Sequence, residues 1–208
     1  MIVPAILTET KEELLRMCNL CASFCDYAQI DVMDGKFVPS KSVSVKDLTG
    51  LRLAIKNEAH LMVEEPLEWL EAFKELGTKR IIIHFEINEN HERIIGEIKK
   101  AGLEAGIAIN PGTRINTFKH LLNKVDSVLF MSVVPGFYGS PFIPAVLEKI
   151  SEFKKMYPKI CTGIDGGVKG DNIVRVMASG VDYACVGSAI LKAKNPETAY
   201  LAIKETNE

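Results

Sequence analysis

The 208-residue sequence lacks a strong net charge, a long apolar run and a basic N-terminal region. Its formal net charge is −2, so no basic face is available to attract nucleic acid. No apolar run approaches the roughly 20 residues that a membrane span needs. The N-terminus has only a short apolar stretch, and we therefore expect neither a membrane span nor a secretory signal peptide.

Cysteine is present but in an odd number, five. Without a secretion signal, an odd count favours a reducing compartment, and we predict a cytoplasmic protein. Cys18, Cys21 and Cys25 have helical spacing, so one face of a helix would carry them. A Cys-x-x-Cys metal or redox site is one interpretation, but we favour small apolar side chains that face the core. Cys161 and Cys185 lie in apolar strand-like runs and are predicted to be buried thiols.

Short apolar runs alternate with amphipathic helical stretches along the chain. The strand-like runs are residues 2–7, 27–33, 58–63, 80–85, 105–110, 127–133, 160–165 and 183–186. The helical stretches are residues 9–24, 66–76, 90–101, 142–156, 171–179 and 196–205. The connection at residues 37–57 is the exception, because only residues 45–55 could hold a short helix. Long loops of this kind in compact domains are often functional.

This alternation is typical of a parallel sheet that is covered by helices. Eight units favour closure into a (β/α)8 TIM barrel, a single domain over residues 1–208. A doubly wound open sheet is the alternative. However, the first strand leads into Thr8-Glu9-Thr10 and not into the G-x-G-x-x-G turn that such a sheet would use. No linker or low-complexity segment divides the chain, so we predict one domain.

In such a barrel, the C-terminal strand ends carry the chemistry. Asp31 lies inside the second strand, where a carboxylate is costly unless it has partners. Asp165 ends the seventh strand and His60 lies in the third, so the three side chains could converge at one mouth. Two carboxylates on opposite faces of a substrate can remove and return a proton, which inverts a stereocentre. The carbanion or enediolate in between needs charge stabilisation, most simply from a metal ion with His and carboxylate ligands.

Methionines and glycines at other strand ends complete the predicted site. Met33, Met62 and Met131 would form a dry, polarisable floor. His84, at the end of the fourth strand, could contact the substrate, brace a ligand or simply pack, and these alternatives stay open. Glycine turns before helices bind phosphate through backbone N–H groups, and barrels commonly bind phosphate after strands 7 and 8. The predicted phosphate-binding residues are Gly166, Gly167, Gly187 and Ser188.

Six sequence blocks extend over essentially the whole chain: QIDVMDGKFVP, AHLMV, INPGT, MSVVPGFYGSPFI, GIDGG and VGSAI. Together they resemble the signature of the ribulose-phosphate 3-epimerase family. That family has a TIM barrel and interconverts ribulose 5-phosphate and xylulose 5-phosphate, and a close relative acts on allulose 6-phosphate. The resemblance implies a metal-dependent isomerase of the pentose phosphate pathway, with a small sugar phosphate as its substrate. It also implies a homo-oligomer.

The resemblance further implies a role for each matching residue. Asp31 and Asp165 would be the paired catalytic acid and base, and they would also hold a divalent metal ion (Zn, Mn, Fe or Mg) together with His60. The residues that would line the reacting carbons are Met33, His60, Met62 and Met131. A mobile loop with Gly136, Phe137, Tyr138 and Gly139 would close over the substrate. The phosphate would lie against Gly166, Gly167, Gly187 and Ser188.

Four positions depart from the family pattern. Gln29 stands where the family has a histidine metal ligand, and a neutral amide oxygen binds zinc less well than imidazole does. Gln29 would then be a weak fourth ligand, or the site would prefer a harder ion, such as manganese or magnesium, or work without one. Ala5 replaces a serine that contacts the substrate, and Val134 and Ser140 also differ. Because these changes cluster at the mouth, two alternatives stay open: an epimerase for another ketose phosphate, and a non-catalytic sugar-phosphate-binding barrel.

Overall fold

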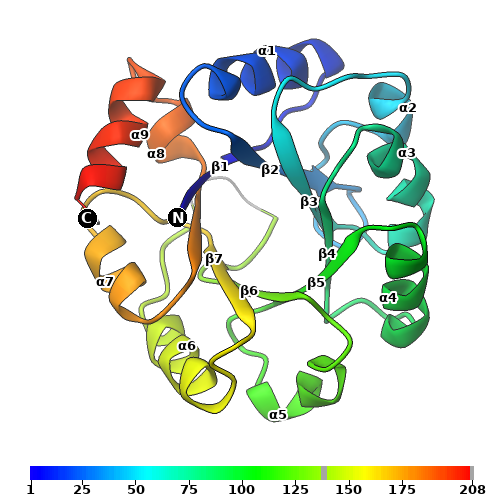
Figure 1. Ribbon diagram of the computed structural model, residues 1–208, viewed down its shortest axis with the longest axis vertical. Coiled ribbons are helices and arrows are strands. Elements are labelled where there is room, and N and C mark those ends of the chain that lie inside the picture. The colour runs from blue at the N-terminus through cyan, green and yellow to red at the C-terminus, as the bar shows by residue number, and fades with distance from the viewer. Residues whose placement is uncertain (137–139, 207–208) are drawn as a thin grey trace.

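The computed structural model describes residues 1–136 and 140–206. In this part of the chain, eight parallel strands pair in sequence order and the last strand pairs with the first. The strands thus form a closed barrel, and helices surround it (Figure 1). The predicted (β/α)8 TIM barrel is confirmed, and the open doubly wound sheet is excluded.

The strands agree with the predicted runs to within two residues at each end. They are β1 (Ile2–Ile6), β2 (Tyr27–Met33), β3 (Lys56–Met62), β4 (Arg80–His84), β5 (Glu104–Ile109), β6 (Ser127–Met131), β7 (Cys161–Asp165) and β8 (Tyr183–Val186). Side chains alternate between the two faces of a strand. Every second side chain therefore points into the barrel, and the others pack against the helices.

All six predicted helical stretches contain helix. They correspond to α1 (Lys11–Ala22), η1 (Pro66–Trp69) with α3 (Leu70–Glu75), α4 (His91–Lys100), α6 (Ala145–Met156), α7 (Ile173–Ala178) and α9 (Pro196–Glu205). The long second connection holds only α2 (Val45–Leu48). Three further elements were not predicted: α5 (Ile115–Phe118), η2 (Lys119–Leu121) and α8 (Ser188–Leu191). Each has three or four residues, too few for a helical period to show in the sequence.

Helix α1 explains the cysteine spacing. Thr10 caps its N-terminus by accepting a hydrogen bond from the backbone N–H of Glu13 at 3.2 Å. Cys18 and Cys21 are buried on the face that packs against the barrel. Cys25 lies beyond the helix end, half-buried, and its thiol donates to the backbone oxygen of Cys21 at 3.2 Å. The core interpretation of Cys18 and Cys21 is confirmed.

The N-terminal end of the barrel contains a buried ion pair. Arg80 donates to Glu58 Oε2 at 3.0 Å and to Glu104 Oε2 at 2.7 Å, and Glu58 is fully buried. Burial raises the pKa of Glu58 to about 7, although the neighbouring Arg80 opposes the shift. This end of the barrel is therefore held by charged groups, whereas apolar side chains such as Ile82 and Leu129 fill its middle.

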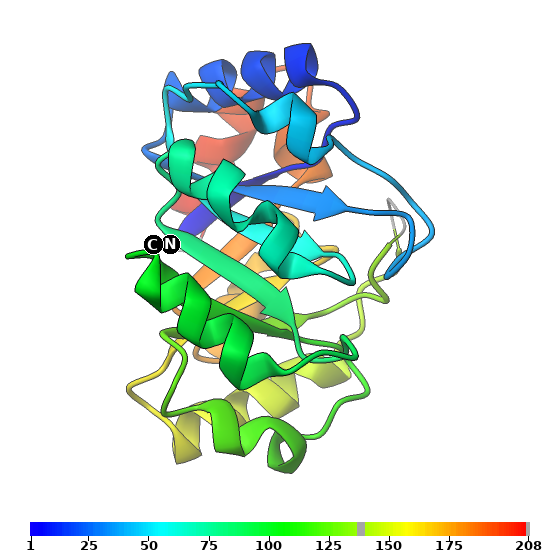
Figure 2. The same cartoon turned by 90° about the vertical axis from the view of Figure 1, so that its right-hand side faces the viewer.

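The side view shows the direction of the strands (Figure 2). Their arrowheads point to one side of the molecule, and the N-terminus lies on the opposite side. The side chains near the C-terminal strand ends therefore share one rim of the barrel. Within the described residues, no helix is long and apolar enough to cross a membrane.

Candidate active site

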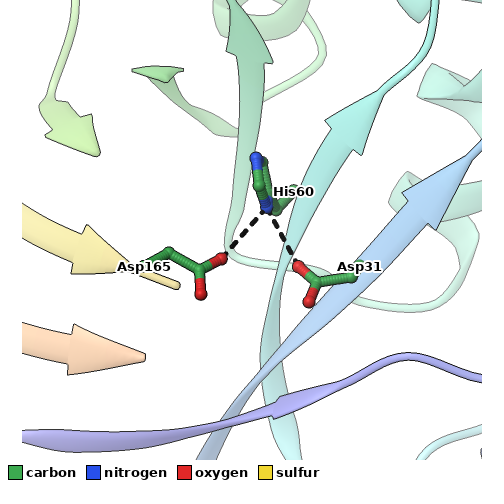
Figure 3. Close-up of side chains that lie close together, drawn as sticks. All are labelled: Asp31, His60 and Asp165. Atoms are coloured by element: carbon green, nitrogen blue, oxygen red, sulfur yellow. Dashed lines mark hydrogen bonds and ion pairs between the residues drawn. The ribbon is translucent and has the colours of Figure 1, made fainter. Parts of the chain in front are cut away.

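Three of the predicted residues meet at the C-terminal end of the barrel (Figure 3). Asp31 on β2 and His60 on β3 are register partners in adjacent strands, and Asp165 is the last residue of β7. His60 Nδ1 lies 3.0 Å from Asp31 Oδ1 and 3.3 Å from Asp165 Oδ2. His60 is fully buried, and the two aspartate side chains are each only 12% exposed. The fold thus places two nearly buried carboxylates on either side of one imidazole.

Gln29 lies beneath the same pair of carboxylates. Its Nε2 donates to Asp31 Oδ1 at 2.8 Å and to Asp165 Oδ2 at 2.7 Å. Its Oε1 accepts a hydrogen bond from the thiol of Cys185 at 3.1 Å. The amide nitrogen, and not the oxygen, therefore faces the carboxylates. For Gln29 to bind a metal ion, its amide would have to turn, so its role as a ligand stays a prediction.

Cys185 was predicted only as a buried thiol. It is buried, but it also lines the mouth cavity and fixes the amide of Gln29. The strand alternation could have revealed this, because Cys185 lies two residues before Gly187 and so shares its face.

Burial and charge determine the protonation of this cluster. Burial raises the pKa of Asp31, and the like charge of Asp165 adds to the shift. Burial alone would lower the pKa of His60, but hydrogen bonds to Asp165 and Asp31 raise it to about 9. A carboxyl group with a raised pKa beside a second carboxylate is the arrangement that lets one act as acid and the other as base.

A second layer of polar groups lies behind His60. His60 Nε2 is 2.9 Å from Nε2 of His84, which is fully buried, and His84 Nδ1 is 3.3 Å from Glu86 Oε2. Burial lowers the pKa of His84 to about 4. Burial would raise the pKa of Glu86, but hydrogen bonds from His84, Thr113 and the backbone of Asn110 lower it overall. Of the three alternatives for His84, the structure shows contact with the candidate ligand His60.

A cavity of about 130 Å³ opens above these groups. The predicted site residues that line it are Asp31, Met33, His60, Met62, Met131, Gly136, Asp165, Gly166, Gly167, Gly187 and Ser188. Phe137, Tyr138 and Gly139 lie outside the described residues. Leu7, Val133 and Val168 also line the cavity. These three were missed, because an apolar residue after a strand carries no signal that separates a cavity wall from the core.

The turn after β7 requires glycine. Gly166 and Gly167 have φ angles of 109° and 65°, a region that L-residues with side chains rarely adopt. A Cβ atom on Gly166 would lie 2.5 Å from Val133 Cγ2. Ser132 Oγ donates to the backbone oxygen of Gly166 at 2.6 Å and so holds the turn against β6. The turn therefore presents backbone without side chains to the cavity, as phosphate binding would need.

Asp31, His60 and Asp165 lie close enough together to hold a metal ion. Among the described residues, they form one group whose ligand atoms all lie within 4.8 Å of one another. Around a tetrahedral ion with bonds of about 2.1 Å, neighbouring ligand atoms are about 3.4 Å apart. The separations of 3.0 and 3.3 Å between His60 Nδ1 and the two carboxylates are close to this value. Two carboxylates and one imidazole thus fit a divalent metal ion.

Comparison with known sequences gives a consistent result. The model described as the ribulose-phosphate 3 epimerase family matches residues 1–191. A ribulose-phosphate 3-epimerase from Mycobacterium leprae is 35% identical over 98% of this chain and 93% of its own length. A ribulose-phosphate 3-epimerase from Aquifex aeolicus is 37% identical over 86% of this chain and 83% of its own length.

Solved structures at low sequence identity support the fold alone. The 3-hexulose-6-phosphate synthase from Salmonella typhimurium has a TM-score of 0.70 at 15% identity and covers 99% of this chain and 97% of its own. The phosphoribosyl anthranilate isomerase from Thermococcus kodakaraensis has a TM-score of 0.68 at 16% identity, with the same two coverages of 99% and 97%.

Proposed function

The chain belongs to the ribulose-phosphate 3-epimerase family, whose members are carbohydrate isomerases, and we propose that it interconverts ribulose 5-phosphate and xylulose 5-phosphate by inverting carbon 3. The observation that carries this proposal is the pair Asp31 and Asp165, which share His60 Nδ1 and Gln29 Nε2 as donors and line one cavity. Two proton-transfer groups that reach opposite faces of one carbon can invert it by removing a proton on one face and returning one on the other.

The two aspartates have complementary roles in this mechanism. One carboxylate removes the proton from carbon 3, and the other aspartate supplies a proton to the opposite face. In the reverse direction the two residues exchange roles. Among the described residues, the bonds to Gln29 and His60 use Asp31 Oδ1 and Asp165 Oδ2, so the other oxygen of each carboxylate faces no protein donor.

Asp31, His60 and Asp165 would hold the divalent metal ion. When bound, such an ion stabilises negative charge on the substrate oxygens while carbon 3 is deprotonated. Met33, Met62 and Met131 are each at most 6% exposed, and they exclude water from the reacting carbons. We assign the phosphate to Gly166, Gly167, Gly187 and Ser188. Gly136 would close the cavity together with the predicted loop residues Phe137, Tyr138 and Gly139.

A longer ketose phosphate, of the allulose 6-phosphate type, is the second candidate substrate. A neighbouring groove of about 590 Å³ shares Leu7, Met33 and Gly136 with the mouth cavity. Ala5 also lines the cavity and adds little bulk or polarity there. A substrate with one more carbon would therefore find room beside β1.

The decisive experiment follows carbon 3 in deuterated buffer. Purified protein with added Zn²⁺, Mn²⁺, Fe²⁺ or Mg²⁺ is incubated with ribulose 5-phosphate and with allulose 6-phosphate, and NMR measures epimer formation and deuterium uptake. Asp31→Asn and Asp165→Asn should each lower epimerisation by about 10²–10⁴-fold. If allulose 6-phosphate is the faster substrate, the second candidate replaces the first. Sugar phosphate binding without turnover under every condition would instead support a non-catalytic barrel.

We also expect a cytoplasmic homo-oligomer. Light scattering on the purified protein tests the oligomer, because a mass close to the 23.0 kDa of one chain would contradict it.

A further inference from the structure

A chain of hydrogen bonds leads from the active site to the loop after β5. Its members are His60, His84, Glu86 and Thr113, with the backbone N–H of Asn110. We propose that Glu86, acting through His84, is a positioning residue that keeps a proton on His60 Nε2 and so leaves Nδ1 as the nitrogen that would bind a metal ion between the two aspartates. The consequence for catalysis rests on the proposed function, but the tautomers themselves do not.

The chain begins at Glu86, whose two oxygens have different partners. Oε1 accepts from the backbone N–H of Asn110 at 2.9 Å and from the hydroxyl of Thr113 at 2.6 Å. Oε2 faces His84 Nδ1 at 3.3 Å. An ionised carboxylate can only accept hydrogen bonds, so the proton of this contact belongs to His84 Nδ1.

The same argument then fixes His60. A neutral imidazole with a proton on Nδ1 has a lone pair on Nε2. His84 Nε2 lies 2.9 Å from His60 Nε2, and two ring nitrogens at this distance need one proton between them. That proton belongs to His60 Nε2. His60 Nδ1 lies 3.0 Å from Asp31 Oδ1 and 3.3 Å from Asp165 Oδ2 and donates to these carboxylates. With Nε2 keeping its proton, Nδ1 is the nitrogen that would give up its proton to bind a metal ion.

The far end of this chain is held rigidly. Lys149 on α6 donates to three backbone oxygens in the loop after β5: Asn110 at 3.1 Å, Pro111 at 2.7 Å and Thr113 at 3.1 Å. This clamp keeps the two donors to Glu86 Oε1 in place. His84 itself is fully buried and packs against the ring of Phe37, with the ring centres 4.8 Å apart. A carboxylate held by fixed donors is suited to orient a ligand histidine from behind.

The geometry makes Glu86→Gln an informative variant. The two donors from Asn110 and Thr113 require an acceptor at the Oε1 position, so the glutamine oxygen must lie there. Its NH₂ group then faces His84 Nδ1 and donates to it. His84 must carry its proton on Nε2, His60 Nε2 becomes the acceptor, and the proton of neutral His60 moves from Nε2 to Nδ1. A change that keeps the side-chain shape thus reverses both tautomers.

The test uses the full-length protein labelled with ¹⁵N-histidine. Long-range ¹H–¹⁵N NMR distinguishes protonated from unprotonated ring nitrogens, and calorimetry measures Zn²⁺ affinity. In the wild type we expect His84 to be protonated on Nδ1. In Glu86→Gln we expect its proton on Nε2 and a Zn²⁺ affinity that is about 10–100-fold lower.

Thr113→Val is the matched control, because it removes one donor to Glu86 but keeps the carboxylate. His84 should then remain protonated on Nδ1. The inference is overturned if Glu86→Gln, folded by circular dichroism, leaves the proton on His84 Nδ1, or if its Zn²⁺ affinity stays within twofold of the wild type. If the tautomers reverse as expected but the wild type turns over no ketose phosphate, the proposed function fails and the positioning role stands.

Discussion

Gln29 donates a hydrogen bond to Asp165, a residue 136 positions later in the chain, at 2.7 Å. The same nitrogen donates to Asp31 at 2.8 Å, and the thiol of Cys185 holds the amide oxygen. One neutral amide therefore joins the two carboxylates that we propose as acid and base. A hydrogen bond to a charged acceptor contributes about 1.5–3 kcal/mol, so the amide of Gln29 should stabilise the two carboxylates substantially.

Gln29→Met should destabilise the metal-free protein. Methionine has nearly the same length but no N–H group, so the carboxylates of Asp31 and Asp165 lose a shared donor. We expect the free energy of unfolding in urea, measured with EDTA, to fall by at least about 1.5 kcal/mol. Cys185→Ser is the control, because its hydroxyl can still donate to the amide oxygen, and we expect its stability to stay close to that of the wild type. A Gln29→Met protein as stable as the wild type would show that the hydrogen bonds from Gln29 to the two aspartates do not stabilise the fold.

Gln29→Glu should make the fold depend on metal. A third carboxylate beside Asp31 and Asp165 adds repulsion between like charges in a buried site. The melting temperature should therefore fall in EDTA, and Mn²⁺ or Zn²⁺ should raise it by more than they raise that of the wild type. Equal metal-induced shifts in the two proteins would mean that position 29 does not face the ion.

Variants that keep only one of the two aspartates should exchange the proton on carbon 3 with solvent much faster than they invert that carbon. Because each carboxylate reaches one face of carbon 3, a variant with a single aspartate can still remove the proton on that face. Asp31→Asn and Asp165→Asn should thus each exchange the proton of a different epimer with deuterated solvent, while epimerisation by each falls by about 10²–10⁴-fold. NMR of ribulose 5-phosphate and xylulose 5-phosphate, incubated separately, measures this. Exchange of the same epimer by both variants would contradict the assignment of the faces.

Gly166→Ala should weaken the binding of phosphorylated substrates. Alanine at φ 109° is strained, and its Cβ would lie 2.5 Å from Val133, so the turn must move. We expect KM for the ketose phosphate to rise about tenfold or more. Gly170→Ala, in the same connection, is the control, because a Cβ there meets nothing within 4 Å and KM should not change. If both variants keep the wild-type KM, the phosphate does not bind at this turn.

Glu58 should make stability depend on pH. Its pKa is raised from 4.5 to about 7 in the folded protein, so the folded state binds this proton more tightly than the unfolded chain. The free energy of unfolding should therefore fall as the pH rises from about 4.5 to about 7, by at most about 3 kcal/mol at about 1.4 kcal/mol per unit. Urea denaturation at several pH values should show that Glu58→Gln reduces this slope. Glu71→Gln, on an exposed side chain, should keep it. Equal slopes in all three proteins would refute the expectation.

Much of the fold could be predicted because its signals are local. The apolar runs placed all eight strands, and the helical period placed six helical stretches. Only the three- and four-residue elements α5, η2 and α8 were missed, since one turn of helix has no period to detect. The strand-end position of Asp31 and Asp165 could also be predicted, because a carboxylate is unusual in an otherwise apolar strand.

The sequence by itself determined the barrel, the family and the types of side chain at the mouth. It did so because alternation, strand order and motif spacing are properties of neighbouring residues. Only the tertiary structure decided that the amide nitrogen of Gln29 faces the carboxylates, that Cys185 orients it, and that Glu86 stands behind His84. These contacts depend on strand register and barrel closure, which bring together β2, β7 and β8, and on the burial that makes each polar group need a partner.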